Sequence, residues 1–128
     1  MKTIIAGSRT IIDYNLVVKA IKESGFTITE VVCGLAKGVD SLGEQYAIEN
    51  NIPVTYFPAD WEKLGRSAGP IRNEQMGDYA SAVICVWDGK SRGTKHMIHY
   101  ARKKNLQIYI LNLQEDNTSL QKFLTQDK

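Results

Sequence analysis

The stretch Ala82-Val83-Ile84-Cys85-Val86-Trp87 is the most apolar run of the chain, and it decides the fold. A short, continuous apolar run is typical of a strand that is buried on both faces of a parallel sheet. A glycine-bearing loop at residues 89–93 follows it, and then a helical segment from residue 94 to about 104. The sequence therefore predicts a central strand here, followed by a crossover helix.

The same alternation of strand and helix continues on both sides of this stretch. Further strands are predicted at residues 3–6, 30–33, 53–57 and 107–111, and further helices at residues 13–25, 40–50, 70–79 and 117–124. Such alternation implies right-handed crossovers and a parallel sheet covered on both faces. We predict an α/β, Rossmann-like three-layer sandwich whose five-stranded parallel sheet has the order 3-2-1-4-5. We expect residues 1–128 to form one domain, with a last helix and a frayed end at residues 117–128.

The charge, the apolar runs and the cysteines of the chain indicate in which cellular setting the protein works. The 128 residues carry a net charge of +2, which is too mild to argue by itself for nucleic-acid binding. No apolar run is long enough to span a bilayer, and the first residues lack the apolar core of a signal peptide. Cys33 and Cys85 lie in apolar runs, as reduced core cysteines do. We therefore expect a cytoplasmic protein without membrane contact.

The four loops that follow the first four strands share an unusual composition. Each combines glycine with lysine or arginine, whereas the loops at the opposite edge lack this pairing. In such folds ligands bind beyond the carboxyl ends of the strands, where these loops meet. Glycine lets a ligand approach the backbone, and the cations favour phosphate. The predicted ligand-binding residues are Gly7, Ser8, Arg9, Gly34, Lys37, Gly38, Asp40, Arg66, Ser67, Gly69, Arg72, Asn73, Gly93 and Thr94.

The third loop, residues 65–74, is the strongest candidate for an anion site. It is predicted to enter a helix at Pro70, which would place the amides of residues 67–69 at a helix N-terminus that favours anions. Arg66 and Arg72 flank this turn and would clamp a phosphate from both sides. On this interpretation Arg72 is a first-turn surface residue that contributes little to stability. The alternative is a capped helix whose arginines are only solvated.

Several other side chains leave two interpretations open. Asp40 either caps the second helix or accepts hydrogen bonds from a ribose, or does both. Trp61 and Trp87 flank two of the loops and either belong to the core or stack on a base. His96 is a candidate ligand contact near a helix start, but His96 and His99 lack further metal ligands. We therefore expect no metal and no cofactor.

The third and fourth helices carry apolar side chains beyond what one sheet face needs. The residues concerned are Tyr79, Met97, Ile98 and Tyr100. We therefore expect a homodimer or a larger homo-oligomer.

The loop motifs, taken together, resemble the SLOG superfamily, and within it the small YspA/YpsA-related branch. The resemblance covers roughly residues 1–112. It is carried by Gly7-Ser8-Arg9, GLAKGVD at residues 34–40, Asp60-Trp61 with GRSAGPIRN at residues 65–73, and Gly93-Thr94. It implies a Rossmann-like fold that binds nucleotides or nucleotide-derived ligands at these loops. Relatives in the superfamily include the LOG phosphoribohydrolases and DprA, the DNA-processing protein of natural transformation.

One departure from the LOG motif bears on catalysis. LOG enzymes carry P-G-G-x-G-T-x-x-E, whose glutamate is catalytic. With the motif aligned on Gly93-Thr94, Lys90 and Ser91 replace the two leading glycines and Met97 replaces the glutamate. Methionine transfers no proton and stabilises no oxocarbenium-like centre. Glu74 is a candidate substitute, so the sequence leaves enzymatic activity open.

Three functions fit these features. The favoured one is binding of a nucleotide or nucleotide-derived ligand by a sensor, sequestering or processing module. The second is a phosphoribohydrolase-like N-glycosidase that acts on nucleoside 5′-monophosphates through Glu74 or Asp40. The third is a DprA-like single-stranded DNA binder, which the modest charge and the lack of a clear aromatic and basic track disfavour.

Overall fold

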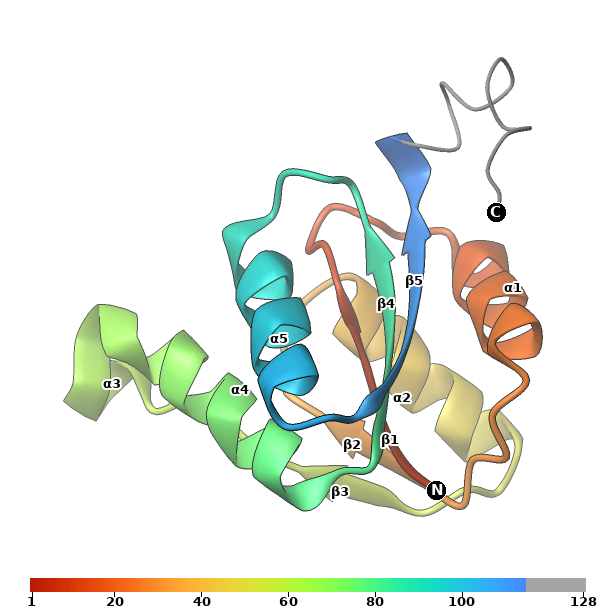
Figure 1. Cartoon of the computed structure of the whole chain (residues 1–128), viewed down its shortest axis with the longest axis horizontal. Helices are drawn as coiled ribbons and strands as arrows, with labels where there is room; N and C mark the ends of the chain where they lie inside the picture. Colours follow the sequence, from red (N-terminus) through yellow and green to blue (C-terminus); the bar gives the residue numbers. More distant parts are fainter. Residues whose placement is uncertain (115–128) are drawn as a thin grey trace.

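The computed structural model describes residues 1–114 of the chain (Figure 1). Its strands are β1 (Lys2–Gly7), β2 (Glu30–Cys33), β3 (Val54–Tyr56), β4 (Ala82–Trp87) and β5 (Gln107–Asn112). They pair in parallel in the order β3-β2-β1-β4-β5, which confirms the predicted sheet. The apolar stretch that forms β4 lies between β1 and β5. The helix predicted at residues 117–124 lies outside the described residues.

Helices cover both faces of the sheet, as predicted. The four longer ones are α1 (Tyr14–Ser24), α2 (Val39–Glu49), α4 (Ala68–Tyr79) and α5 (Arg92–Lys103). The boundaries of α1 follow from its sequence signals. The Asp13 side chain accepts a hydrogen bond from the Asn15 amide, and Gly25 ends the helix in the left-handed conformation with φ 70°.

The core consists of two apolar clusters, one on each face. Ile5 and Ile84 belong to the cluster that packs against α1 and α2, whereas Ile4 and Val83 belong to the cluster that packs against α4 and α5. Successive strand residues face opposite sides, so strands buried on both faces must be apolar without interruption. This burial is why the strands can be recognised from sequence.

Two of the four apolar residues expected to form a homo-oligomer surface are buried instead. Met97 and Ile98 are only 1% and 3% exposed, because both belong to the core cluster beneath α5. They offer no surface to a second copy, so the expected oligomer stays a prediction without their support. Light scattering at micromolar concentration would measure the mass. None of the helices within residues 1–114 is long and apolar enough to cross a membrane.

The segment predicted as an anion-binding loop is helical. A short helix, α3 (Trp61–Leu64), and a 3-10 turn, η1 (Gly65–Ser67), lead directly into α4. Gly65 adopts φ 57° at the end of α3. The helix α4 begins at Ala68, so Pro70 lies inside its first turn. The N–H groups of a first turn have no intrahelical partner, so a proline there costs no helical hydrogen bond.

Candidate functional site

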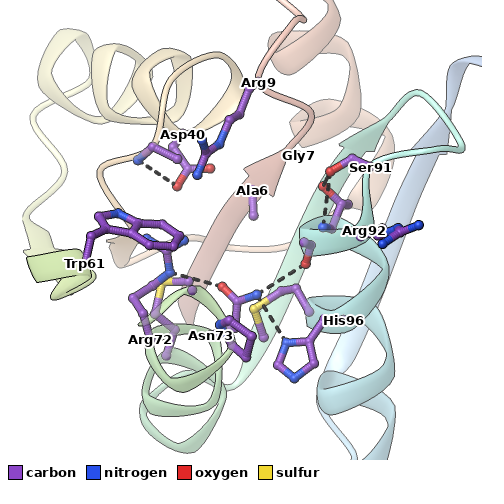
Figure 2. Close-up of a pocket in the computed structure, with 17 residues that line it drawn as sticks. Ala6, Gly7, Arg9, Asp40, Trp61, Arg72, Asn73, Ser91, Arg92 and His96 are labelled. Atoms are coloured by element: carbon purple, nitrogen blue, oxygen red, sulfur yellow. Dashed lines mark hydrogen bonds between the residues drawn. The ribbon is translucent and has the colours of Figure 1, made fainter. Parts of the chain in front are cut away.

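A pocket of about 490 Å³ opens at the carboxyl edge of the sheet, between the start of α4 and the start of α5 (Figure 2). This volume falls within the range of about 300–1,000 Å³ that is typical of small-molecule sites. Eight of the fourteen predicted residues line it, namely Gly7, Arg9, Asp40, Gly69, Arg72, Asn73, Gly93 and Thr94. The structure thus brings together residues from all four predicted loops.

The other six predicted residues lie around the pocket without lining it. They are Ser8, Gly34, Lys37, Gly38, Arg66 and Ser67. Some of them hold the surrounding loops in place. The Ser8 hydroxyl accepts a hydrogen bond from the Asp88 amide at 3.0 Å, and Gly38 has φ 74° where its backbone meets Ser8 and Arg9.

Arg72 is the main correction to the predicted site. It is only 8% exposed, and its Nη1 donates a hydrogen bond to the carbonyl oxygen of Gly34. Its Nε donates to Oδ1 of Asn73 at 3.1 Å. The guanidinium is therefore held by the protein, and the prediction that Arg72 lies on the surface was wrong. The sequence signal could not reveal this, because Gly34 is 38 residues away.

Asp40 is the buried carboxylate of the pocket, at 4% exposed. Its Oδ2 accepts a hydrogen bond from the Ala36 amide at 3.3 Å, and α2 begins at Val39 with Gly38 as its N-cap, so Asp40 is not that cap. Burial raises the pKa of Asp40, and the nearby positive charge of Arg72 opposes this rise. The pocket therefore keeps a carboxyl group away from bulk water beside a fixed cation.

Gly34 lets Asp40 and Arg72 approach each other. A Cβ at this position would lie 2.6 Å from Arg72 Nη1 and 2.9 Å from Asp40 Oδ2. Any larger residue would push the two charged groups away from the backbone, so this predicted glycine serves the site from outside the pocket.

Arg66 and Arg72, the two arginines of the predicted phosphate clamp, do not line the same pocket. Arg66 is exposed on η1 and does not line the pocket, and the amide of Ala68 already donates to the carbonyl oxygen of Gly65. Gly69, whose amide was predicted to bind the anion, instead makes room for a neighbouring side chain. A Cβ there would lie 3.2 Å from Cη2 of Trp61, so the glycine lets the indole lie close against α4.

Trp61 forms one wall of the pocket. Its side chain is half exposed, and Cζ of Arg9 lies 5.8 Å from the centre of its ring. Figure 2 shows Trp61, Asp40 and Arg9 on one side of the pocket and Ser91 and Arg92 on the other. Trp87, the other tryptophan, donates its Nε1 hydrogen to the Ser91 carbonyl at 3.1 Å and does not line the pocket. Of the two tryptophans, Trp61 is the one that lines the pocket.

Asn73 joins the two sides through a hydrogen-bond chain. Because Arg72 Nε is always a donor, Oδ1 of Asn73 accepts from it, and the Asn73 Nδ2 group is then the donor. Nδ2 donates to the Gly93 carbonyl at 3.2 Å and lies 3.3 Å from Nδ1 of His96. This second contact is a hydrogen bond when Nδ1 of His96 is the acceptor nitrogen of the ring. Asn73 thus connects the buried Arg72 to the start of α5.

Several backbone amides at the start of α5 already donate hydrogen bonds to neighbouring side chains. The Ser91 hydroxyl accepts from the Thr94 amide, and Oδ1 of Asp88 accepts from the Lys90 and Ser91 amides at 2.8 Å each. These amide hydrogen bonds lower the pKa of Asp88. Gly93 lines the pocket, and a Cβ there would meet no atom within 4 Å, so space remains for a ligand at this turn.

Sequence reasoning did not assign the apolar lining of the pocket. Met76 and Met97 are each 1% exposed, yet both contribute to it, together with Ala6, Ala36 and Pro70. Apolar residues in a helix or strand indicate a core, and only the fold shows which of them border a cavity. Ser91 and Arg92 also line the pocket although they were not among the predicted residues.

The candidate catalytic residue Glu74 lies apart from the pocket lining. Its carboxylate is 3.7 Å from Nε2 of His96, whereas Met97, at the position of the LOG glutamate, borders the pocket. Asp40 is the one carboxylate among the lining residues. Within residues 1–114, no group of three or more His, Cys, Asp or Glu side chains is arranged to hold a metal ion.

Two curated proteins from phage genomes are similar to part of this chain. An uncharacterized SPbeta prophage-derived protein, YoqJ of Bacillus subtilis, is 30% identical over 73 residues, which are 57% of this chain and 38% of that protein. The gene 61 protein of Mycobacterium phage D29 is 31% identical over 84 residues, or 61% of this chain and 67% of that protein. The matched region therefore spans well under half of the Bacillus protein.

Among solved structures, DNA processing protein A (DprA) from Streptococcus pneumoniae has a similar fold, with a TM-score of 0.66. The match covers 84% of this chain and 48% of DprA at 17% sequence identity, so it shows the fold alone. The model of the YspA, cpYpsA-related SLOG family matches residues 1–64, which hold β1, β2, β3 and the Asp60-Trp61 motif. The resemblance seen in the loop motifs is thereby confirmed, and the chain belongs to the YspA, cpYpsA-related SLOG family.

Proposed function

We propose that the chain binds a nucleotide or nucleotide-derived small molecule in this pocket, as a sensor or sequestering module. The observation that carries the proposal is the combination of a half-exposed indole with a buried carboxylate, Trp61 and Asp40, in one pocket at the sheet edge. A flat aromatic wall suits a base, and a desolvated carboxylate suits ribose hydroxyl groups. Arg9 supplies positive charge beside the Trp61 ring.

The positions of the lining residues favour one orientation of the ligand. The base would lie against Trp61 beneath Arg9, and the ribose would lie over Asn73 and Asp40. The phosphate would then reach the first turn of α5, where Gly93 leaves open space and a helix N-terminus favours an anion. The methionines beneath would exclude water from the sugar.

Trp61→Ala should weaken nucleotide binding by about tenfold, because base stacking on an aromatic side chain is worth about 1–3 kcal/mol. Calorimetric titration with AMP, ADP, ATP, their guanine counterparts and ADP-ribose would measure it. The matched control is Arg66→Ala, which removes an exposed arginine outside the pocket. Equal affinities for the wild type and Trp61→Ala, with a loss in Arg66→Ala, would show that the ligand binds elsewhere.

Base release from nucleoside monophosphates should be slow or absent. Glycoside hydrolysis typically uses two carboxylates across the scissile bond, and the pocket offers only Asp40. Chromatographic detection of free base after prolonged incubation would measure turnover. Residual turnover should disappear in Asp40→Asn and persist in Glu74→Gln. Rapid hydrolysis that depends on Glu74 would establish the N-glycosidase alternative instead.

A further inference from the structure

The segment that carries Trp61 lies almost entirely on the surface. Every residue from Trp61 to Ser67 is exposed, and this is the longest exposed run within residues 1–114. The four longer helices each bury several side chains, whereas α3 and η1 bury none of theirs. An element without buried contacts belongs to the least stable part of a fold, from which moving lids are drawn. We call residues 61–67 the α3 arm.

The α3 arm lies between two fixed anchors. Before it, the Phe57 amide donates to the carbonyl oxygen of Cys33 at 2.8 Å, and the Phe57 ring packs against the core cluster beneath α4 and α5. After it, Ala68 is only 1% exposed. Figure 1 shows α3 projecting beyond the sheet at the outer end of α4. The arm can therefore change its position while both anchors keep theirs.

Gly65 joins α3 to the turn before α4 in a conformation that favours glycine. Its φ is 57° and its ψ is −135°, which lies outside the left-handed helical region that other residues adopt occasionally. A Cβ there would meet no atom of the described residues within 4 Å, so the backbone requires this glycine and the packing does not. Such a residue, placed where an exposed arm joins a buried helix, is suited to be a hinge.

Trp61 is the part of the α3 arm that meets the pocket. Its ring lies close to Gly69 and has Cζ of Arg9 5.8 Å from its centre. Arg9 belongs to the loop after β1 and forms no ion pair within residues 1–114, so its charge is available to the ring. A ligand that stacks on Trp61 would bury part of its exposed half. Such a ligand favours the position of the arm beside the pocket.

We propose that the α3 arm is a lid on the pocket, with Gly65 as its hinge and Arg9 as its latch, and that a bound nucleotide holds the lid closed through Trp61. The ligand part of this proposal rests on the proposed function. The hinge stands on the exposure of the arm and on the backbone of Gly65. Gly65 is thus a positioning residue, because it acts on the ligand only through the indole.

NMR relaxation dispersion of the free protein tests the lid without any ligand. The indole N–H of Trp61 should show exchange on the microsecond-to-millisecond timescale of lid motion. Trp87 is the internal control, because its indole N–H is held by the Ser91 carbonyl oxygen and should show none. Arg9→Gln should raise the open population about two- to fivefold, through loss of the cation–π contact. Equal exchange at the two indoles, or none at either, would overturn the lid.

Calorimetric titration with AMP and ADP-ribose tests the hinge. Gly65→Ala should weaken binding by about tenfold, as Trp61→Ala does, because the displaced indole no longer stacks. The double variant should bind no more weakly than Trp61→Ala, since both changes remove one contact. The melting temperature of Gly65→Ala should stay within about 2 °C of the wild type, because the arm buries no side chain.

The matched control for the hinge is Gly25→Ala. It makes the same substitution at the end of α1, where φ is 70° and a Cβ meets no atom of the described residues within 4 Å. Because α1 packs into the core, this variant should lower the melting temperature by about 4 °C and leave nucleotide binding unchanged. The two glycine variants should therefore have opposite effects on binding and stability.

The outcomes separate the lid from the proposed function. If neither nucleotide binds to the wild type, the proposed function fails, while a mobile Trp61 indole supports the lid and a rigid one overturns it. If binding depends on Trp61 but Gly65→Ala binds as the wild type does, the lid is overturned and the proposed function stands. If the double variant binds more weakly than Trp61→Ala, Gly65 does not act through the indole and the hinge is overturned.

Discussion

Arg72→Ala is expected to lower the melting temperature by about 12–20 °C, the result of losing about 3–5 kcal/mol of stability at neutral pH. The substitution leaves the Gly34 carbonyl oxygen and Asn73 Oδ1 without their donor. It also leaves the buried carboxylate of Asp40 without the cation that offsets its desolvation. Differential scanning calorimetry would measure the change.

The loss in Arg72→Ala should depend on pH. Burial already raises the pKa of Asp40, and removal of Arg72 raises it further because that charge opposed the rise. A carboxyl whose pKa is raised on folding contributes most stability when it is protonated, and that contribution disappears as pH rises from about 4. The gap between variant and wild type should therefore be wider at pH 7.5 than at pH 5, and Asp40→Asn should narrow it.

The matched control for this prediction is Arg66→Ala. Arg66 is exposed on η1 and has no ion pair within residues 1–114, so its loss should change stability by about 0.5 kcal/mol or less. A difference of 2 °C in melting temperature corresponds to about 0.5 kcal/mol of unfolding free energy. If Arg72→Ala melts within about 2 °C of the Arg66→Ala control, the role assigned to the buried guanidinium is contradicted.

Gly7→Ala should prevent stable folding, with an expected loss of about 4 kcal/mol or more. Gly7 ends β1 beside β4, and a Cβ there would collide with the carbonyl oxygen of Val86 and lie 2.8 Å from Cγ2 of Val39. The backbone of an interior strand cannot move aside without breaking the sheet. Soluble yield and circular dichroism during chemical denaturation would measure the effect.

Gly93→Ala is the matched control for Gly7→Ala. It makes the same substitution at the same sheet edge, where a Cβ meets nothing within 4 Å. Its stability should equal or slightly exceed that of the wild type, since alanine reduces the entropy of the unfolded chain. A well-folded Gly7→Ala, or a strongly destabilised Gly93→Ala, would contradict the packing at this edge.

The fold was predictable because its signals are local. Runs such as residues 82–87 are apolar without interruption since both faces are buried, and Asp13 and Gly25 mark a helix by chemistry that acts within a few residues. The alternation of these signals was enough to predict the parallel sheet and the edge at which its loops meet.

The site was predictable only in outline. Glycine-bearing loops with Lys or Arg identified the correct edge of the sheet. Residues 65–69 have the composition of a loop, yet they are helical. The helix can begin before Pro70 because proline is tolerated in a first helical turn. The role of Arg72 depends on Gly34 and Asp40, which only the tertiary fold brings near. The apolar lining of the pocket is likewise indistinguishable from core in the sequence.

The most direct test of the central claim is a two-dimensional ¹⁵N NMR titration of the wild-type chain with the nucleotide panel. We predict that at least one nucleotide or ADP-ribose-like compound shifts the amides of Gly7, Ala36, Asn73 and Gly93 and the indole N–H of Trp61, which line the pocket. The amides of α1 should stay unchanged. Shifts confined to other surfaces, or no shifts with any compound at millimolar concentration, would contradict it.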